Sequence, residues 1–412
     1  MNGQVESGKR RIEWARAHMK VLGAIATDLK AKQTFQGLRI GMALHVEAKT
    51  AVLALTLREA GAAVRLASCN PLSTDDSVAQ ALRESYGLET YARKGESREE
   101  YYGNLNRVLD FEPHLVIDDG GDLIFLLHTQ RQSLLPGIIG GNEETTTGVV
   151  RLKAMAAEGK LAFPVIDVND AHMKYLFDNR YGTGQSTMDG IMSSTNLLLA
   201  GKRLVVAGYG WCGRGIAWRA RGLGAIVSVT EVDAIRAVEA TLDGFPVLPM
   251  KEAMPSADLI ITATGVKDVL TEEHLALVKD GCLLANSGHF DNEISKSGLE
   301  RLSNGKRTVR ENVEEFAFPD GRKVYLLADG RLVNLVAGQG HPAEIMDMSF
   351  SVQALAAKYL VDHRGKLAKA VHQVPAEVDQ DIARLRLTTW GIHIDALTQE
   401  QSRYRTSWHE GT

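Results

Sequence analysis

The chain of 412 residues is longer than one hydrophobic core usually supports, so we expect two large domains. Its composition, with 44% hydrophobic residues, 24% charged residues and a net charge of -4, excludes a disordered chain and gives no basis for nucleic acid as a partner. The three cysteines have no spacing typical of a metal site or a disulfide framework, which indicates a reducing compartment. We see no export signal and no apolar run of about 18 residues, and therefore expect a cytoplasmic protein with no membrane partner and no metal.

The first part of the chain alternates short apolar runs with stretches of helical periodicity, which is the pattern of a parallel α/β sheet. Four apolar runs each end just before a polar residue, at 38–44, 62–67, 113–117 and 163–168. Ligands bind beyond the carboxyl ends of parallel strands. We therefore expect His45, the adjacent Asp118 and Asp119, and Asn169 to converge on one crevice.

The next part of the chain, 185–340, is expected to form a Rossmann domain. Gly208, Gly210 and Gly213 fit the pattern G-x-G-x-x-G between an apolar strand and a segment with helical spacing. At such a turn the backbone approaches a pyrophosphate closely, and the helix N-terminus favours its charge. Glu231 follows at the end of the next predicted strand, where a carboxylate accepts from a ribose 2′-hydroxyl. A carboxylate there repels a 2′-phosphate, so NAD is favoured over NADP.

A last helix is expected to begin near Pro342 and to return to the first domain, because apolar residues from Ile345 to Tyr359 lie roughly on one face. The predicted fold class is α/β, with two doubly wound parallel-sheet domains and a small helical C-terminal tail. The expected boundaries are 1–180 and 343–370 for the substrate-binding domain, 185–340 for the NAD-binding domain and 371–412 for the tail.

Six strings are rich in polar, chemically capable side chains: "LHVEAKTAV" (44–52), "DDGGD" (118–122), "EETTTG" (143–148), "VNDAHMKYLFDNRYG" (168–182), "NSGHFDNEI" (286–294) and "GQGHPAEIMDMSF" (338–350). Together they resemble the S-adenosyl-L-homocysteine hydrolase family, and most of all its shorter forms from thermophilic bacteria and archaea. The resemblance runs from about residue 12 to the C-terminus. It implies a cytoplasmic homotetramer of the methyl cycle, with one tightly bound NAD per subunit.

The chemistry of that family is a hydrolysis that passes through an oxidation. Bound NAD⁺ oxidises the ribose 3′-hydroxyl, the ketone acidifies the 4′ proton, homocysteine leaves by β-elimination, water adds, and the ketone is reduced again. The net reaction converts S-adenosyl-L-homocysteine reversibly to adenosine and L-homocysteine. The cofactor is regenerated in each turnover.

The resemblance implies five catalytic residues. Lys174 and Asp178 match the positions beside the 3′-hydroxyl, and Asp119 matches the acid/base for the 4′ proton. His45 and His289 match two imidazoles near the 5′ carbon, where groups that titrate near neutrality suit protonation of the thiolate and activation of water. A lysine serves as a base only if burial or neighbouring cations lower its pKa, which we expect of a closed pocket.

The resemblance also implies two sets of binding residues. The substrate set is Glu47, Lys49, Thr50, Glu144, Thr145, Asn169, Asn179 and His341. The cofactor set is Thr145, Thr146, Thr147, Gly208, Gly210, Gly213, Glu231, Thr264, Asn286 and Asn334.

The string expected to read the base departs from the family's common form, H-M-T-x-E-T, because Glu47 and Lys49 replace its threonine and glutamate. Such a pair can satisfy adenine, which offers a donor at N6 and an acceptor at N1, or hypoxanthine, which offers an acceptor at O6 and a donor at N1. If 45–49 is extended, both side chains point to one side. If the helix has already begun, at most one of them reads the base. S-inosyl-L-homocysteine therefore stays open as an alternative substrate.

Two other departures bear on the site and the assembly. Thr183 stands where the family commonly has cysteine, and the tail lacks the lysine and tyrosine extension that reaches a neighbouring subunit's NAD in longer members.

An ordinary NAD-dependent dehydrogenase that releases NADH is one competing function. A non-catalytic NAD-binding regulator is another, although such proteins usually lose catalytic side chains, which this chain retains.

Overall fold

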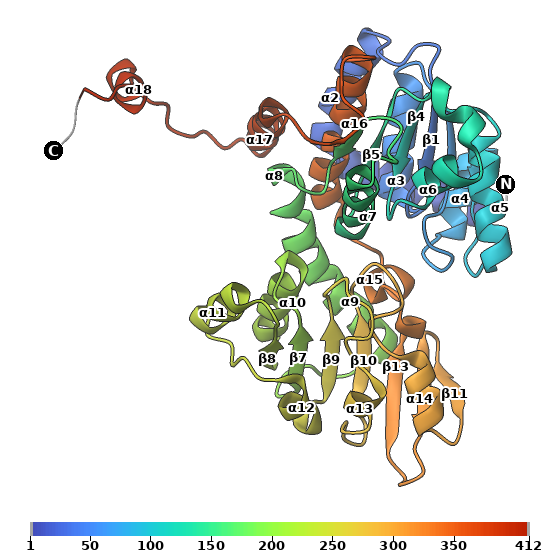
Figure 1. The fold of residues 1–412 in the computed structure, drawn as a ribbon, viewed down its shortest axis with the longest axis vertical. Helices are drawn as coiled ribbons and strands as arrows, with labels where there is room; N and C mark the ends of the chain where they lie inside the picture. Colours follow the sequence, from blue (N-terminus) through green and yellow to red (C-terminus); the bar gives the residue numbers. More distant parts are fainter. Residues whose placement is uncertain (1–2, 410–412) are drawn as a thin grey trace.

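The computed structural model describes residues 3–409, so the outermost residues of the first predicted domain and of the predicted tail lie outside the described part. It consists of two α/β bodies, one above the other in Figure 1. The chain crosses from the first body to the second between α8 (His172–Tyr175) and α9 (Thr183–Thr195). It returns between α15 (Val333–Val336) and α16 (Ala343–Asp362).

The sheet of the first body has the strand order β14-β6-β5-β4-β1-β2-β3, and all neighbouring strands are parallel. Leu115 and Ile117 of its central strand pack in one hydrophobic cluster, whereas Val116 packs in another. Alternate residues of a strand face opposite sides, so this sheet is buried on both faces. Its strands are β1 (Arg39–Ala43), β2 (Ala63–Ala67), β3 (Glu89–Tyr91), β4 (Leu115–Asp118), β5 (Gly140–Glu143), β6 (Val165–Asp167) and β14 (Val371–Gln373).

The sheet of the second body has the order β11-β12-β13-β10-β9-β7-β8, in which β11 and β12 are antiparallel to their neighbours and the other pairs are parallel. Leu204 and Val206 enter one core and Val205 the other, so this body is also doubly wound. The predicted fold class is confirmed. The strands are β7 (Arg203–Ala207), β8 (Ile226–Thr230), β9 (Leu259–Thr262), β10 (Leu283–Asn286), β11 (Lys306–Arg310), β12 (Val313–Ala317) and β13 (Lys323–Leu327).

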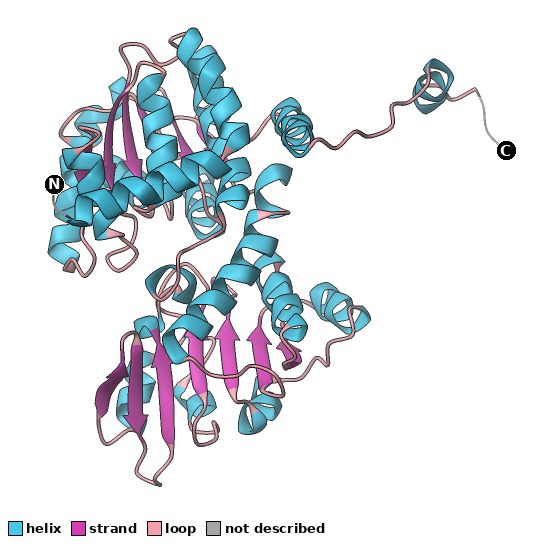
Figure 2. Ribbon diagram, turned by 180° about the vertical axis from the view of Figure 1, so that it is seen from behind, coloured by secondary structure: helices cyan, strands magenta, loops and turns pink. Residues whose placement is uncertain are grey.

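Helices lie against both faces of the sheets in Figure 2, and no helix among residues 3–409 is long and apolar enough to cross a membrane. Helices not yet named are α1 (Gly3–His18), α2 (Lys20–Ala31), α3 (Ala48–Glu59), α4 (Asp76–Glu84), α5 (Arg98–Leu109), α6 (Asp122–Thr129), α7 (Thr146–Ala157), α10 (Trp211–Gly222), α11 (Ala234–Leu242), α12 (Met250–Ala253), α13 (Glu272–Leu275), α14 (Lys296–Leu302), α17 (Ala376–Trp390) and α18 (Gln399–Thr406). Shorter turns are η1 (Gln132–Gly137), η2 (Asp178–Gly182), η3 (Met254–Ser256) and η4 (Ala328–Gly330).

The chain returns to the first body and stays there beyond the predicted segment 343–370. Met348 and Val352 of α16 pack in the core of the first body. Beyond α16, Val371 of β14 pairs in parallel with Val165, and Ile382 of α17 joins the same core. The predicted tail boundary at residue 371 is therefore wrong, because a three-residue edge strand carries no apolar pattern of its own. After α17 the chain runs outward to α18, away from both bodies (Figure 1).

Candidate active site

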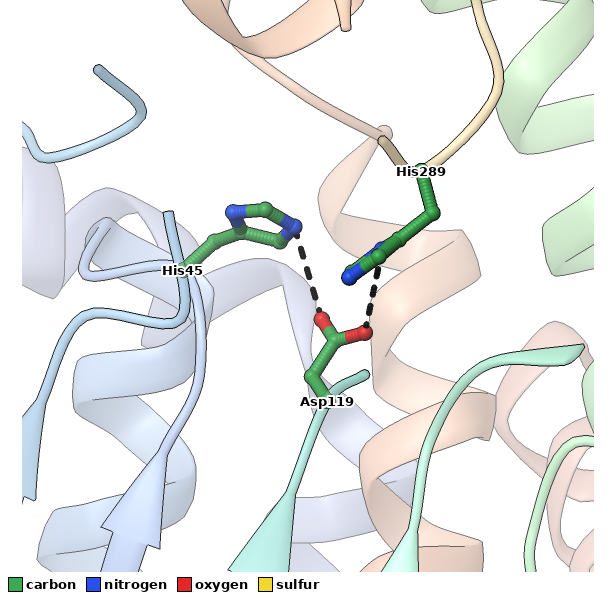
Figure 3. A group of neighbouring side chains, drawn as sticks. All are labelled: His45, Asp119 and His289. Carbon is green, nitrogen blue, oxygen red and sulfur yellow. Dashed lines mark ion pairs between the residues drawn. The ribbon is translucent and has the colours of Figure 1, made fainter. Parts of the chain in front are cut away.

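Three predicted catalytic side chains meet where the two bodies face each other (Figure 3). Asp119 Oδ2 lies 3.4 Å from His45 Nε2, and Asp119 Oδ1 lies 3.7 Å from His289 Nδ1. Ligand-forming atoms of the three residues lie within 4.8 Å of one another. The carboxylate thus lies between an imidazole of the first body and an imidazole of the second.

The strand ends of the first sheet explain part of this convergence. His45 follows β1 and Asp119 follows β4, and these strands are neighbours in the sheet. Asp118 does not face the crevice as predicted, because its carboxylate turns inward and accepts from the backbone N–H of Ile124. His289 belongs to the loop after β10 of the second body.

The loop that carries His289 is held by Asn286. Its amide nitrogen donates to the carbonyls of Gly288, Phe290 and Gly330, and its oxygen accepts from the Gly288 N–H at 2.7 Å. The side chain is fully buried and its hydrogen-bonding capacity is used within the chain. Asn286, which was predicted to bind the cofactor, orders the His289 loop in this structure.

Gly120 makes room for His289, because a Cβ on this residue would lie 2.4 Å from His289 Nε2. The loop around Gly120 is fixed from two sides. Its N–H donates to Glu143 Oε1 at 2.8 Å, and the same oxygen accepts from the N–H of Thr145. Its carbonyl accepts from Arg151. Glu143 was not among the predicted residues, although it lies in the "EETTTG" string.

Burial holds both imidazoles neutral at physiological pH. It lowers the pKa of His45 to about 4, although Asp119 acts in the opposite direction. Burial also lowers the pKa of His289 against the effect of Asp119. The expectation of titration near neutrality is therefore wrong for His45 in this conformation, and the pKa of His289 is shifted in the same direction. A neutral imidazole is suited to accept a proton from water, and it must be protonated before it can act as an acid.

A second buried cluster surrounds Lys174. Its Nζ donates to Asn179 Oδ1 at 2.8 Å and to Asp178 Oδ1 at 3.0 Å, and it lies 3.6 Å from Glu144 Oε1. The Asn179 amide nitrogen in turn donates to Asn169 Oδ1 at 3.1 Å. Five residues predicted from two separate strings thus form one network.

The charges in this network contradict the expectation for Lys174. Burial by itself lowers the pKa of Lys174, but Asp178 and Glu144 outweigh burial and raise it above its usual value. Burial by itself raises the pKa of Asp178, yet Lys174 and His341 hold it below its usual value. For Glu144 burial prevails over Lys174 and raises the pKa to about 7. Lys174 is therefore a buried cation among carboxylates.

Helix α16 supplies two residues that the sequence reasoning missed. Ser349 Oγ donates to Glu144 Oε1 at 2.6 Å, and Gln353 Nε2 donates to Glu144 Oε2 at 2.5 Å. The Gln353 amide is itself oriented by Asn142, whose Nδ2 donates to Gln353 Oε1 at 3.0 Å. All of these side chains are buried. The signal in the sequence is the row of polar residues, from Asp347 to Gln353, inside an otherwise apolar helix.

The predicted base-reading pair lies at the start of α3. Glu47 is extended, with φ of -145°, and caps the helix by accepting from the N–H groups of Lys49 and Thr50. Lys49 Nζ lies 2.6 Å from Glu47 Oε2 and donates to the carbonyl of Gln339 at 2.8 Å. Neither of the two predicted backbone arrangements applies alone, because the helix begins between the two residues.

A cavity of about 1110 Å³ opens beside this pair, and His341 also lines it. His341 Nε2 lies 3.0 Å from Thr183 Oγ1, at the residue that replaces the family's cysteine. Met188 and Leu335 of the second body also line the cavity, so both bodies contribute to its wall.

The glycine turn of the second body has the geometry of a dinucleotide site. Gly208 has φ of +98°, and a Cβ on Gly213 would lie 1.9 Å from the Gly208 carbonyl oxygen. At Gly210 the nearest atom to such a Cβ is 3.6 Å away, so this residue has open space in front of it. Gly210 precedes α10 without a side-chain cap, and Glu231 lies beside the turn, accepting from the Tyr209 N–H at 2.6 Å.

The other predicted cofactor residues differ in whether their side-chain oxygens already have a hydrogen-bond partner. Thr147 Oγ1 and Asn334 Oδ1 are buried atoms for which the described structure has no hydrogen-bond partner. Thr145 and Thr146 stand at the start of α7 near Thr147. Thr264 donates through its hydroxyl to Glu293 at 2.8 Å, so its side chain is already engaged.

The comparisons with known proteins agree with this geometry. Residues 2–136 match the model of S-adenosyl-L-homocysteine hydrolase, and residues 179–340 match the model of its NAD-binding domain. The chain belongs to the S-adenosyl-L-homocysteine hydrolase family. The resemblance proposed from the sequence is thereby confirmed, and the chain is an enzyme of this hydrolase family with NAD as its cofactor.

Relatives with two different names resemble the chain equally. It is 57% identical over 405 residues to an adenosylhomocysteinase of Thermoplasma volcanium, covering 98% of this chain and 99% of the relative. It is also 57% identical over 406 residues to an S-inosyl-L-homocysteine hydrolase of Methanococcus maripaludis, covering 98% and 97%. Among solved structures, a dipicolinate synthase chain of Bacillus halodurans matches 80% of this chain and 99% of its own length with a TM-score of 0.50, and its 12% identity shows the fold alone.

The residues at the glycine turn fit NAD. The open space at Gly210, the uncapped start of α10 and the unpartnered Thr147 and Asn334 oxygens are features that a bound dinucleotide would use. Glu231 lies beside the turn, where its carboxylate can accept a hydrogen bond from a ribose hydroxyl of the cofactor.

Proposed function

We propose that the protein catalyses the reversible hydrolysis of S-adenosyl-L-homocysteine to adenosine and L-homocysteine. The observation that carries this proposal is the meeting of Asp119 with one histidine from each body, next to the cluster around Lys174. An oxidation followed by elimination and addition of water needs several proton-transfer groups at one substrate. Two buried clusters beside a NAD-binding body supply them.

Each group then has a role at a stated position. Asp119 moves the 4′ proton of the ketone, and its position between His45 and His289 places it beside groups that act at the 5′ carbon. The neutral imidazoles activate the incoming water. Lys174, as a cation next to Asp178, stabilises negative charge that develops on the 3′ oxygen.

When bound, NAD⁺ supplies a hydride acceptor for the ribose C3′ and returns the hydride later. Gly208, Gly210 and Gly213 would hold the pyrophosphate at the start of α10, and Glu231 would accept from the adenosine ribose. Thr147 would hold the cofactor from the first body.

Two glycine variants separate cofactor contact from packing. Gly210→Ala is expected to leave the thermal midpoint unchanged, since its Cβ meets no atom nearer than 3.6 Å, but to weaken NAD binding at least tenfold. Gly213→Ala is expected to lower the free energy of unfolding by about 1–3 kcal/mol, because its Cβ collides with the Gly208 carbonyl. Calorimetric titration of the NAD-free protein and thermal melts measure both effects. Undiminished NAD affinity in Gly210→Ala would contradict the proposed pyrophosphate site.

S-inosyl-L-homocysteine hydrolysis is the second candidate function, and the contacts of Glu47 favour it. The Glu47 carboxylate is engaged by the helix cap and by Lys49, so the ammonium of Lys49 is the polar group of this pair left for the base. An ammonium can only donate, and hypoxanthine presents an acceptor at O6. The N6 amine of adenine would need an acceptor at this place.

Thiol release measured without added NAD tests both candidates. The kcat/KM values for the adenosyl and inosyl compounds are compared in the wild type and in Lys49→Met, with the half-buried Lys358, replaced by Met, as a control outside the site. If Lys49 reads O6, the variant is expected to lose at least tenfold in kcat/KM for the inosyl compound and less for the adenosyl compound. Thiol release from neither compound would exclude the proposed hydrolysis, and net accumulation of NADH would indicate an ordinary dehydrogenase.

We also propose a cytoplasmic homotetramer that acts in the methyl cycle. Apolar side chains that are largely exposed in the single chain support an assembly, among them Ile235 and Leu242 on α11 and Ile394 and Trp408 on the C-terminal arm. The cysteines are free, which agrees with a reducing compartment. Sedimentation of the holoenzyme tests the oligomeric state.

A further inference from the structure

We propose that Glu293 is a positioning residue that links the turn 263–265, here called the Thr264 turn, to the loop 287–293 that carries His289. Through this link, bound NAD helps to hold His289 beside Asp119. The inference rests on the proposed function, since His289 acts there at the 5′ carbon of the substrate. Glu293 lies in the NSGHFDNEI string, and the family resemblance gave it no role.

Three neighbouring strands of the second sheet bring the linked segments together. In the sheet β9 lies between β7 and β10, and both pairs are parallel, so the carboxyl ends of the three strands meet at one edge. The glycine turn follows β7, the Thr264 turn follows β9, and the His289 loop follows β10. This is the edge of an open α/β sheet at which ligands bind.

The Thr264 turn packs between two parts of the chain that are expected to hold NAD. A Cβ on Gly208 of the glycine turn would lie 3.0 Å from Thr264 Cγ2. A Cβ on Gly265 would lie 3.4 Å from Cγ2 of Thr147, whose buried hydroxyl oxygen has no hydrogen-bond partner in the described structure. Cofactor binding at either place therefore acts directly on the Thr264 turn.

The side chain of Glu293 reaches the Thr264 turn from the end of the His289 loop. Its Oε1 accepts from the Gly265 N–H at 2.7 Å, and its Oε2 accepts from the N–H and the hydroxyl of Thr264 at 3.0 and 2.8 Å. Consecutive backbone N–H groups in a turn form a concave site for an anion. The Glu293 side chain is buried, so water does not compete for these donors.

The same carboxylate lies against the residue before His289. A Cβ on Gly288 would lie only 1.8 Å from Glu293 Oε1, which places the carboxylate in contact with the Gly288 backbone. From the other side Asn286 Oδ1 accepts from the Gly288 N–H at 2.7 Å. Gly288 is thus held between two side chains, and a displacement of the Glu293 carboxylate moves the imidazole that lies 3.7 Å from Asp119.

The backbone at Glu293 is anchored independently of its side chain. The Asp268 N–H donates to the Asn292 carbonyl at 2.8 Å, and the Leu270 N–H donates to the Glu293 carbonyl at 2.9 Å. Because these bonds persist when the side chain changes, substitutions of Glu293 are expected to fold. The length of the side chain then decides whether the link exists.

Two substitutions separate the reach of the side chain from its charge. Glu293→Asp keeps the charge but is shorter by about 1.5 Å, so it cannot contact the Thr264 turn from an unmoved backbone. Glu293→Gln keeps the length. Its amide oxygen can accept from the Gly265 N–H, and its NH₂ group can donate to the Thr264 hydroxyl, which is also an acceptor.

Hydrogen exchange of the holoenzyme measures the link directly. Glu293→Asp is expected to speed the exchange of 287–292 by roughly tenfold or more, and Glu293→Gln to remain close to the wild type. Removal of NAD is expected to speed the exchange of this loop in the wild type and to have little effect on it in Glu293→Asp. Glu315→Asp, which shortens another buried carboxylate of the second body, held by Arg307, is the matched control.

The two halves of the reaction give an independent measurement. In Glu293→Asp, NADH formation on mixing with adenosine is expected to persist while thiol release falls, because His289 acts after the ribose is oxidised. A merely structural defect would lower both together.

Wild-type loop exchange in Glu293→Asp, a loop that does not respond to NAD in the wild type, or an equal loss of both activities would overturn the inference. A defect in Glu293→Gln as large as in Glu293→Asp would assign the effect to charge and would also overturn it. Failure of the proposed function would appear separately, as absence of thiol release in the wild type with the exchange pattern intact.

Discussion

Asp119→Asn is expected to lower the turnover of thiol release by roughly 10²–10⁴-fold, because the amide keeps the shape of the carboxylate but cannot take the 4′ proton. The side chain contacts His45 and His289 at 3.4 and 3.7 Å, so the isosteric change leaves the surrounding packing in place. Steady-state kinetics with thermal melts and NAD content measure the loss and exclude unfolding.

A partial reaction locates the defect of this variant. NADH formation on mixing with adenosine is expected to persist in Asp119→Asn, whereas exchange of the 4′ hydrogen with deuterated water is expected to fall with turnover. Asp110→Asn, which changes an exposed carboxylate paired with Arg131, serves as the control. Normal 4′ exchange in Asp119→Asn would assign that proton transfer to another group.

Gly120→Ala is expected to reduce turnover roughly a hundredfold or more, because its Cβ would lie 2.4 Å from His289 Nε2 and push the imidazole of the second body away from Asp119. The same change strains a backbone with φ of +105°, at a cost of about 1–3 kcal/mol in the free energy of unfolding. Steady-state kinetics and chemical denaturation separate the two effects.

Gly121→Ala is the matched control for this prediction. Gly121 also has positive φ, at +78°, but the nearest atom to its added Cβ is 3.7 Å away and belongs to Gly148. It should therefore show a comparable loss of stability with far smaller loss of turnover. Equal loss of turnover in both variants would mean that backbone strain, and not the position of His289, limits catalysis.

Local patterns in the sequence predict much of the fold. Apolar runs predicted β1, β2, β4 and β6 of the first sheet and the parallel core of the second. They do not predict β5, whose sequence Gly140–Glu143 contains no apolar side chain. This strand lies inside the sheet, between β6 and β4. Cβ atoms on Gly140 and Gly141 would collide with Leu360 and Val116, so the two glycines allow a helix and a neighbouring strand to pack closely. These packing partners are distant in the chain, so the local sequence of β5 does not reveal that it is a strand.

The active site likewise has features that the sequence predicts and features that it does not. The family resemblance identified Lys174 and His45, because each lies in a short recognisable string. It did not predict their charge states, since these depend on burial and on carboxylates from other segments. Ser349 and Gln353 were missed because they reach Glu144 across more than two hundred residues of sequence. Residue types at a site can be recognised locally, whereas their protonation depends on the assembled fold.

The interrupted course of the first body has a consequence for synthesis of the chain. Its core includes Met348, Val352 and Ile382, and its sheet includes β14, so it lacks these parts until the chain has been synthesised past Ile382. The second body is continuous from β7 to β13. Contiguous units fold as they emerge. We therefore expect the second body to complete its fold before the first. Until α16, β14 and α17 are synthesised, the first body exposes the apolar surface that these elements later cover.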